Sequence, residues 1–136
     1  MGKILKRIRA AICRAICGAQ QPSVCNNSDG ALTDKSFILV STPTSGMRVK
    51  SGFTVKGCSR TFESNVPWRF IDRNGNELAS GATTGGGVDG FGTFTFTVNF
   101  SVASQQIGHL EVIEDDPSDG EGFPPVRNVI PLILNP

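Results

Sequence analysis

The one histidine of the chain, His109, lies two residues before Glu111 in the segment IGHLEVIEDD. A histidine close to a carboxylate is the pairing that general acid–base catalysis uses. Alternation places both side chains on one face of a predicted strand, opposite Leu110 and Val112. The pair supports one hypothesis, a small hydrolase or lyase that uses His109 with its acidic neighbours. No sharp strand-to-helix turn presents a nucleophile to it, so a solvated histidine is the simpler interpretation.

An acidic group begins at Glu114 near the end of this segment and continues into the loop after it. Its candidate metal ligands are Asp115, Asp116, Asp119 and Glu121. Calcium prefers several oxygen ligands on a flexible loop, which this composition offers. The spacing does not match the EF-hand template, and a solvated acidic loop is the alternative interpretation. Calcium is the one candidate cofactor, and no other is expected.

Two further groups of side chains are candidates for binding. Glu63 follows a predicted strand close to Arg60, where its carboxylate either pairs with an arginine, accepts backbone N–H groups or meets a ligand. Thr93, Thr95 and Thr97 alternate with apolar residues, so they share one face of another strand. That face is either a flat binding surface or an ordinary exposed threonine row.

The four cysteines, Cys13, Cys17, Cys25 and Cys58, form no CxxC pair, and with a single histidine they do not predict a structural metal site. Cys58 lies within a predicted strand, where a buried thiol is the expected state. A Cys25–Cys58 disulfide is the alternative if the chain is exported. Cys17 precedes a glycine and is the candidate site of lipidation.

The first 18 residues form a basic amphipathic segment. The first 28 residues carry five basic residues and no acid, whereas the remainder carries 12 acids and 8 bases. This charge distribution indicates a targeting or surface-binding head and no nucleic-acid partner. The head is interpreted as an export signal interrupted by Arg14, as a helix in which residues 1–17 lie on a membrane surface, or as a disordered tail.

The elements that would position these groups are short strands. Residues 19–35 have the composition of a polar linker, and the domain is predicted to cover 36–136. Within it, GTFTFTVNF (92–100) alternates strictly, and VPWRFIDRNGNELASG (66–81) predicts a hairpin that turns at Asn74-Gly75. About seven such strands and no helix after residue 18 predict an all-β, immunoglobulin-like antiparallel β-sandwich.

The segment VKGCSRTFESNVPWRFIDRNGNELASG resembles the immunoglobulin-like domain of bacterial spore germination. The residues that carry the resemblance are Val55, Gly57, Ser59, Phe62, Glu63, Asp72, Gly75, Leu78 and Gly81, followed by Gly92, Phe94 and Phe96, and by Ser118, Asp119 and Gly120. The resemblance covers about residues 37–134. Individually these motifs are ordinary, but their order and spacing are specific.

The resemblance implies a domain of bacterial envelope or secreted proteins that acts in binding or assembly and has no established activity. We therefore expect a non-catalytic module of the cell envelope or the extracellular space, linked to germination in the family. Its expected partner is a protein or a cell-wall component. The alternatives are the His109 hydrolase or lyase and a purely structural spacer domain.

Overall fold

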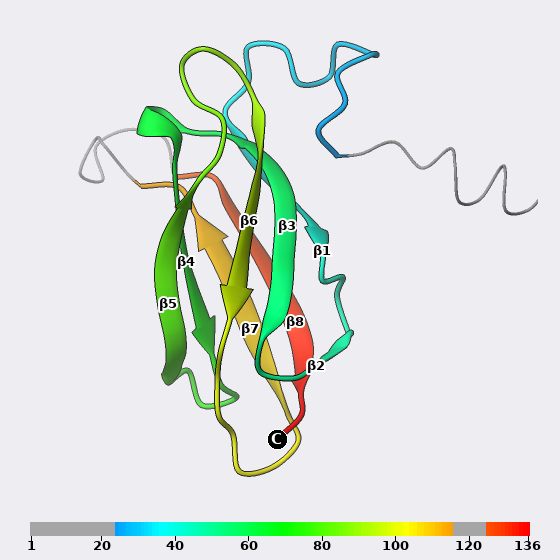
Figure 1. Cartoon of the computed structure of the whole chain (residues 1–136), viewed down its shortest axis with the longest axis vertical. Coiled ribbons are helices and arrows are strands. Elements are labelled where there is room, and N and C mark those ends of the chain that lie inside the picture. The colour runs from blue at the N-terminus through cyan, green and yellow to red at the C-terminus, as the bar shows by residue number, and fades with distance from the viewer. Residues whose placement is uncertain (1–23, 116–124) are drawn as a thin grey trace, which may run out of the picture.

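The fold is a sandwich of two β-sheets, described for residues 24–115 and 125–136 in a computed structural model (Figure 1). Three strands make one sheet in the order β1-β3-β6, and five make the other in the order β2-β8-β7-β4-β5. The strands are β1 (Phe37–Thr42), β2 (Arg48–Val49), β3 (Phe53–Arg60), β4 (Asn65–Ile71), β5 (Glu77–Thr84), β6 (Gly92–Val98), β7 (Gln106–Ile113) and β8 (Arg127–Leu134). A 3-10 turn, η2 (Phe62–Ser64), joins β3 to β4.

The all-β, immunoglobulin-like architecture expected from the sequence is confirmed, with one additional strand. The described residues contain eight strands rather than about seven. The additional strand is β2, a two-residue strand in a segment whose composition is that of a turn-rich connection. After Pro43 the chain leaves the three-stranded sheet, and β2 pairs in parallel with β8 at the edge of the other sheet. The predicted N-terminal helix lies outside the described residues.

The alternating strand β6 faces the core as its pattern predicts. Phe94 and Val98 are buried, whereas Thr93, Thr95 and Thr97 are exposed on the opposite face. The two sheets meet through interdigitating side chains, as sandwiches require. Between them Trp68 of β4 stacks on Phe96 of β6, with ring centroids 4.6 Å apart and an interplanar angle of 7°.

The predicted hairpin is β4–β5, and Asp72 organises its turn. The Asp72 Oδ1 atom accepts backbone hydrogen bonds from Asn74 N at 2.8 Å and Asn76 N at 2.9 Å. Hydrogen bonding to the backbone of Asn76, and then to that of Asn74, lowers the pKa of Asp72. Gly75 has a φ of +83°, a conformation that glycine adopts without strain.

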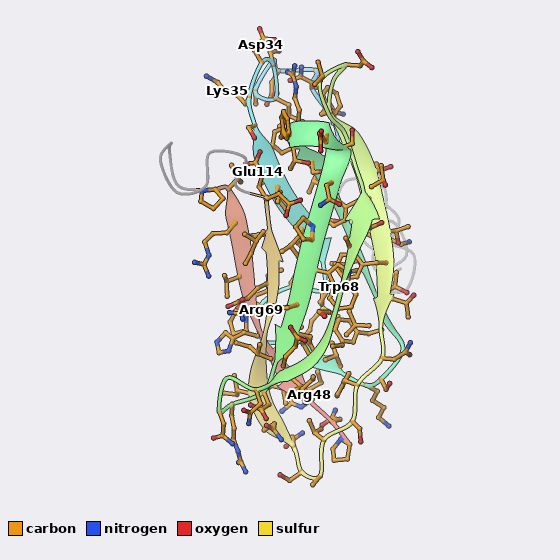
Figure 2. All side chains as sticks on the ribbon, turned by 90° about the vertical axis from the view of Figure 1, so that its left-hand side faces the viewer. Asp34, Lys35, Arg48, Trp68, Arg69 and Glu114 are labelled. Atoms are coloured by element: carbon orange, nitrogen blue, oxygen red, sulfur yellow. A yellow bond between two sulfur atoms is a disulfide. The ribbon has the colours of Figure 1, made fainter. Side chains whose placement is uncertain are left out.

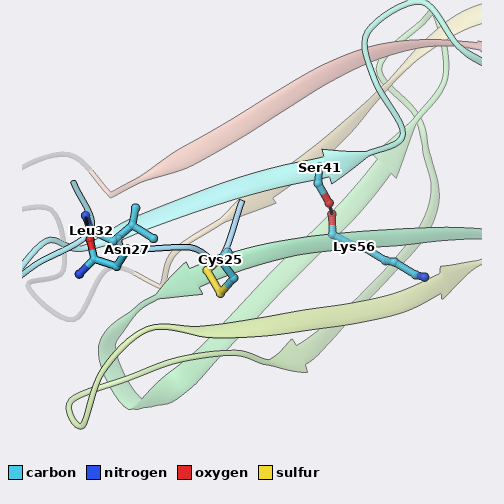
Figure 3. The surroundings of a disulfide bond; sticks show 6 residues. Cys25, Asn27, Leu32, Ser41 and Lys56 are labelled. Carbon is cyan, nitrogen blue, oxygen red and sulfur yellow. Dashed lines mark hydrogen bonds between the residues drawn. A yellow bond between two sulfur atoms is a disulfide. The ribbon is translucent and has the colours of Figure 1, made fainter. Parts of the chain in front are cut away.

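A disulfide joins Cys25 to Cys58, so the expectation of a buried free thiol at Cys58 was wrong (Figure 3). Cys58 alternates with core-facing Val55 and Gly57, and therefore points to the outer side of the three-stranded sheet. The bond fastens the segment before β1 onto that outer side. The two cysteines are 33 positions apart, and strand periodicity carried no information about this pairing. The predicted boundary between a polar linker (19–35) and the domain (36–136) stays a prediction.

The glycine run 85–87 has the composition of a flexible loop, but it packs closely against the sandwich. A Cβ atom on Gly86 would lie 2.2 Å from the backbone nitrogen of Gly92, and one on Gly87 would lie 2.1 Å from the Ser64 Oγ atom. Gly87 N also donates to Gly90 O at 2.9 Å, and Thr61 N donates to Gly86 O at 3.0 Å. The absence of side chains lets this backbone approach its neighbours.

Candidate binding site at one end of the sandwich

A hollow of about 320 Å³ opens at the end of the sandwich where η2, the glycine run and the end of β7 meet. We call it the end hollow. Figure 2 shows Asp34, Lys35 and Glu114 toward this end of the molecule, with Arg48 at the opposite end. The residues that line the end hollow are Asp34, Lys35, Ser36, Arg60, Thr61, Phe62, Gly87, Val88 and Glu114. Of the binding residues predicted from sequence, Arg60 is in this lining.

Arg60 is the last residue of β3, and its guanidinium holds the loop beside it. The Arg60 Nε atom donates to Gly87 O at 3.3 Å, and Nη2 donates to Val88 O at 3.2 Å. Nη1 lies 3.7 Å from Asp34 Oδ1, and the Asp34 side chain is 89% exposed. An ion pair with so exposed a partner adds little stability. The principal role of Arg60 is therefore to fix the loop at residues 87–88.

Glu114 ties three segments together at the floor of the end hollow. Its Oε1 atom accepts from Ser36 Oγ at 3.1 Å and from Phe62 N at 3.4 Å, while Oε2 accepts from Val126 N at 3.3 Å. Charged acceptors make the stronger hydrogen bonds in proteins. The sequence grouped Glu114 with the acidic loop and did not identify this role. Its position directly after a strand was the available signal.

Glu63 follows Phe62 of the end-hollow lining and makes no ion pair with another described residue. Its carboxylate is exposed, and among the described residues it has no hydrogen-bonding partner. Of the alternatives for Glu63, pairing with a nearby arginine is not seen among the described residues: Arg60 faces Asp34, and Arg69 pairs with Glu111. A ligand role for Glu63 stays a prediction.

The backbone next to Phe62 is strained and the adjacent apolar side chains are exposed. Glu63 has a φ of +55° and Ser64 a φ of +63°, values that residues other than glycine seldom adopt. Phe62 is 50% exposed and Val88 is 78% exposed, and both line the end hollow. An aromatic and an aliphatic side chain thus flank a set of fixed polar groups.

The threonine row lies away from the end hollow, on the outer face of β6. β6 is an edge strand of the three-stranded sheet, a question that the sequence left open. The Thr83 hydroxyl of β5 donates to the Thr95 carbonyl at 3.1 Å, so this edge is partly closed by the opposite sheet. Binding through Thr93, Thr95 and Thr97 stays a prediction.

His109 and Glu111 share the outer face of the five-stranded sheet, as predicted, but Glu111 has other partners. Arg69 Nε donates to Glu111 Oε2, and Arg127 Nη2 lies 3.8 Å from Glu111 Oε1. The hydrogen bond to Glu111 raises the pKa of Arg69. His109 lies between Ile71 of β4 and Pro131 of β8 in the sheet register, and it does not line the end hollow.

Two other hollows lie elsewhere on the surface. One of about 380 Å³ includes Met47, Arg48 and Lys50, near the opposite end of the sandwich. The other, of about 240 Å³, lies over β4 and β5 beside Trp68 and Arg69. Neither contains His109 or a residue that the sequence had singled out for binding.

The metal and membrane predictions fall mainly on residues beyond the described ranges. Asp116, Asp119 and Glu121 lie outside them, as does the lipidation candidate Cys17, whereas Asp115 accepts a hydrogen bond from Asn65 Nδ2. Residues 24–115 and 125–136 contain no group of three or more His, Cys, Asp or Glu that could hold a metal ion. In the same ranges, no helix has the length and apolarity needed to cross a bilayer. Calcium binding at the loop stays a prediction.

Comparison with known protein families shows the family to which this β-sandwich belongs. Residues 37–121 match the immunoglobulin-like domain of bacterial spore germination. The chain belongs to this family. The match begins at the first residue of β1 and extends past β7, so it includes Arg60 and Glu114 of the end hollow.

Among solved structures, the family member described here is similar to CopC from Methylosinus trichosporium OB3b. The two sequences are 17% identical, and the alignment covers 75% of this chain and 95% of that one with a TM-score of 0.45. No curated protein matches the chain.

Proposed function

We propose that this protein is a non-catalytic binding module that acts outside the bacterial cytoplasm and contacts a protein or a cell-wall component through the end hollow. One observation carries the proposal: Phe62 and Val88 are exposed in the lining of a hollow where Arg60 and Glu114 are held by internal hydrogen bonds. Groups that are fixed before binding lose less entropy when a partner arrives. Exposed aromatic side chains are also typical anchors of interfaces.

The strained backbone next to Phe62 supports the same location. Two consecutive non-glycine residues with positive φ, Glu63 and Ser64, cost about 1–3 kcal/mol each, a cost that concentrates at functional sites. The Glu63 side chain is exposed, next to the exposed Phe62 in the chain. A partner that meets both would use one apolar and one acidic contact.

The Cys25–Cys58 disulfide supports action outside the cytoplasm. Disulfides persist in oxidising compartments and are rare where thiols are kept reduced. In this proposal the basic residues 1–17 direct the chain to the envelope or contact its membrane surface, and Cys17 is the site of lipidation. The family description makes spore germination the first setting in which to look for a partner.

The alternative hydrolase or lyase has less support. Both carboxylate oxygens of Glu111 are engaged by arginines, so the group that would assist His109 is already occupied. His109 lies on an open sheet face, whereas catalytic groups converge in pockets. A purely structural spacer domain would bind no component of the envelope.

The test measures retention of the purified full-length protein on envelope preparations, walls together with membranes, from the same bacterium. Sedimentation at about 0.5 M salt screens the attraction between the basic head and anionic surfaces. We expect Phe62→Ser to lower the bound fraction severalfold. The control variant Thr95→Ser, on the outer face of β6 and away from the end hollow, should leave the bound fraction unchanged. Equal retention of both variants and wild type would remove the end hollow from the proposal. Absence of retention in all three would favour the spacer.

A further inference from the structure

The segment before β1 supplies one wall of the end hollow. Asp34, Lys35 and Ser36 are in the lining, and β1 begins directly after them at Phe37. The other lining residues belong to the sandwich and to the loops that join its strands. The end hollow therefore keeps this shape only while the segment stays against the sandwich.

The hydrogen bonds around Asn27 close on the segment itself. Asn27 Oδ1 accepts a hydrogen bond from Leu32 N at 2.7 Å (Figure 3), and Asn27 Nδ2 donates to Thr33 Oγ1 at 3.0 Å. Gly30 N donates to Asn27 O at 3.1 Å. These bonds make residues 27–33 one compact unit, but they do not join that unit to either sheet.

At the end next to β1, the segment is attached through Ser36. The Ser36 Oγ atom lies at hydrogen-bonding distance, 3.1 Å, from both Arg60 O and Glu114 Oε1. The ion pair between Asp34 and Arg60 is exposed and adds little stability. Among the described residues that follow Cys25, Asp34 and Ser36 make the polar contacts of this segment with the sandwich.

At the other end, the attachment is the disulfide. Cys58 is fully buried in β3, the central strand of its sheet, and it pairs with Leu39 of β1 and Thr93 of β6. Because both neighbouring strands hold Cys58 in place, the bond fixes Cys25 relative to the end hollow. Without the bond, the segment becomes a tail that is held mainly at its β1 end, and such tails are usually poorly ordered.

We propose that the Cys25–Cys58 bond switches the end hollow between two forms. In the oxidised chain the wall at residues 34–36 is in place and the hollow binds its partner, whereas in the dithiol chain that side is open and binding is weaker. This inference rests on the proposed function of the end hollow. A wall that is fixed before binding loses less entropy when the partner arrives, and reduction removes that advantage.

The switch is a two-electron reaction. When the bond forms, the two thiols lose two protons and two electrons, and an exported protein that carries a reactive disulfide takes them up and leaves as a dithiol. A reduced dithiol protein reverses the reaction by the same exchange. The chain therefore reaches its full binding strength only after it has left the reducing cytoplasm.

The envelope retention assay with the full-length protein, run in the cold, tests the switch. We expect Cys25→Ala, and wild type kept in excess dithiothreitol, to be retained severalfold less than oxidised wild type. Cys13→Ala keeps the bond and should be retained like wild type. Dithiothreitol should not change the retention of Cys25→Ala, which controls for an effect of the reductant on the envelope. The fluorescence of Trp68 establishes whether each form is folded.

A second measurement needs no partner. Backbone relaxation by NMR should show large nanosecond motion of residues 27–35 in Cys25→Ala and restricted motion in oxidised wild type. The signals of Arg48 and Lys50, at the opposite end, should be the same in both forms.

Three results would overturn the switch: equal retention of the oxidised and reduced forms, equal motion of residues 27–35 in both, or a reduced chain that unfolds altogether. The last result would mean that the bond supports the whole sandwich rather than the wall. If oxidised wild type is not retained at all, the proposed function fails instead. The motion of residues 27–35 then still decides whether the bond holds the wall.

Discussion

The disulfide between Cys25 and Cys58 gives the most quantitative prediction. Replacing Cys25 with alanine removes the bond and leaves the buried Cys58 side chain in place. The cross-linked positions are 33 residues apart, and a loop of that length corresponds to about 4 kcal/mol of unfolded-state entropy. For a domain of about 100 residues this equals a loss of roughly 20 °C in the melting temperature.

Urea unfolding followed by the fluorescence of Trp68, the only tryptophan, measures this change, because Trp68 is stacked on Phe96 between the sheets. Cys13→Ala is the matched control and should leave the unfolding free energy unchanged. Wild-type protein treated with a reductant should unfold like Cys25→Ala. A loss below about 1 kcal/mol would show that the segment before β1 contributes little to holding the sandwich.

Three further predictions concern the sandwich itself. Gly86→Ala should cost about 1–3 kcal/mol of unfolding free energy in urea, because the new Cβ would lie 2.2 Å from the Gly92 nitrogen; an unchanged midpoint would contradict the close packing. Asp72→Ala should destabilise the hairpin at pH 7. Because the folded-state pKa of Asp72 is lowered from 3.8, the difference from wild type should be complete above that value and shrink as the pH falls through the lowered pKa. A difference that does not vary with pH would contradict this role of the carboxylate. Phe94→Ala should cost about 3–5 kcal/mol in the same assay, whereas Thr95→Ala on the exposed face should stay within about 0.5 kcal/mol; similar costs would contradict the assignment of the two faces.

Strand periodicity predicted the architecture because half-buried strands record their environment in every second residue. Phe94 and Val98 of the alternating segment 92–100 face the core, since these positions depend on local alternation alone. β2 was missed because two residues are too few to show a period. Its pairing with β8 is a contact between distant segments.

The candidate site was less predictable because its geometry depends on contacts between segments far apart in sequence. Arg60 was identified, but its carbonyl partners come from the glycine run, which composition alone described as a loop. Glu114 reaches Ser36, 78 positions away, and no spacing rule links the two. The same limitation applies to the Cys25–Cys58 bond, which the sequence left as an alternative.

The most direct test of the proposed function is site-specific photo-cross-linking in intact cells that express the full-length protein. A benzophenone amino acid replaces Phe62 in the lining of the end hollow, or Thr95 on the outer face of β6. The account predicts a discrete cross-linked product of higher mass for position 62 and none for position 95. Identical patterns at both positions, or no product at position 62, would contradict the end hollow as the contact surface.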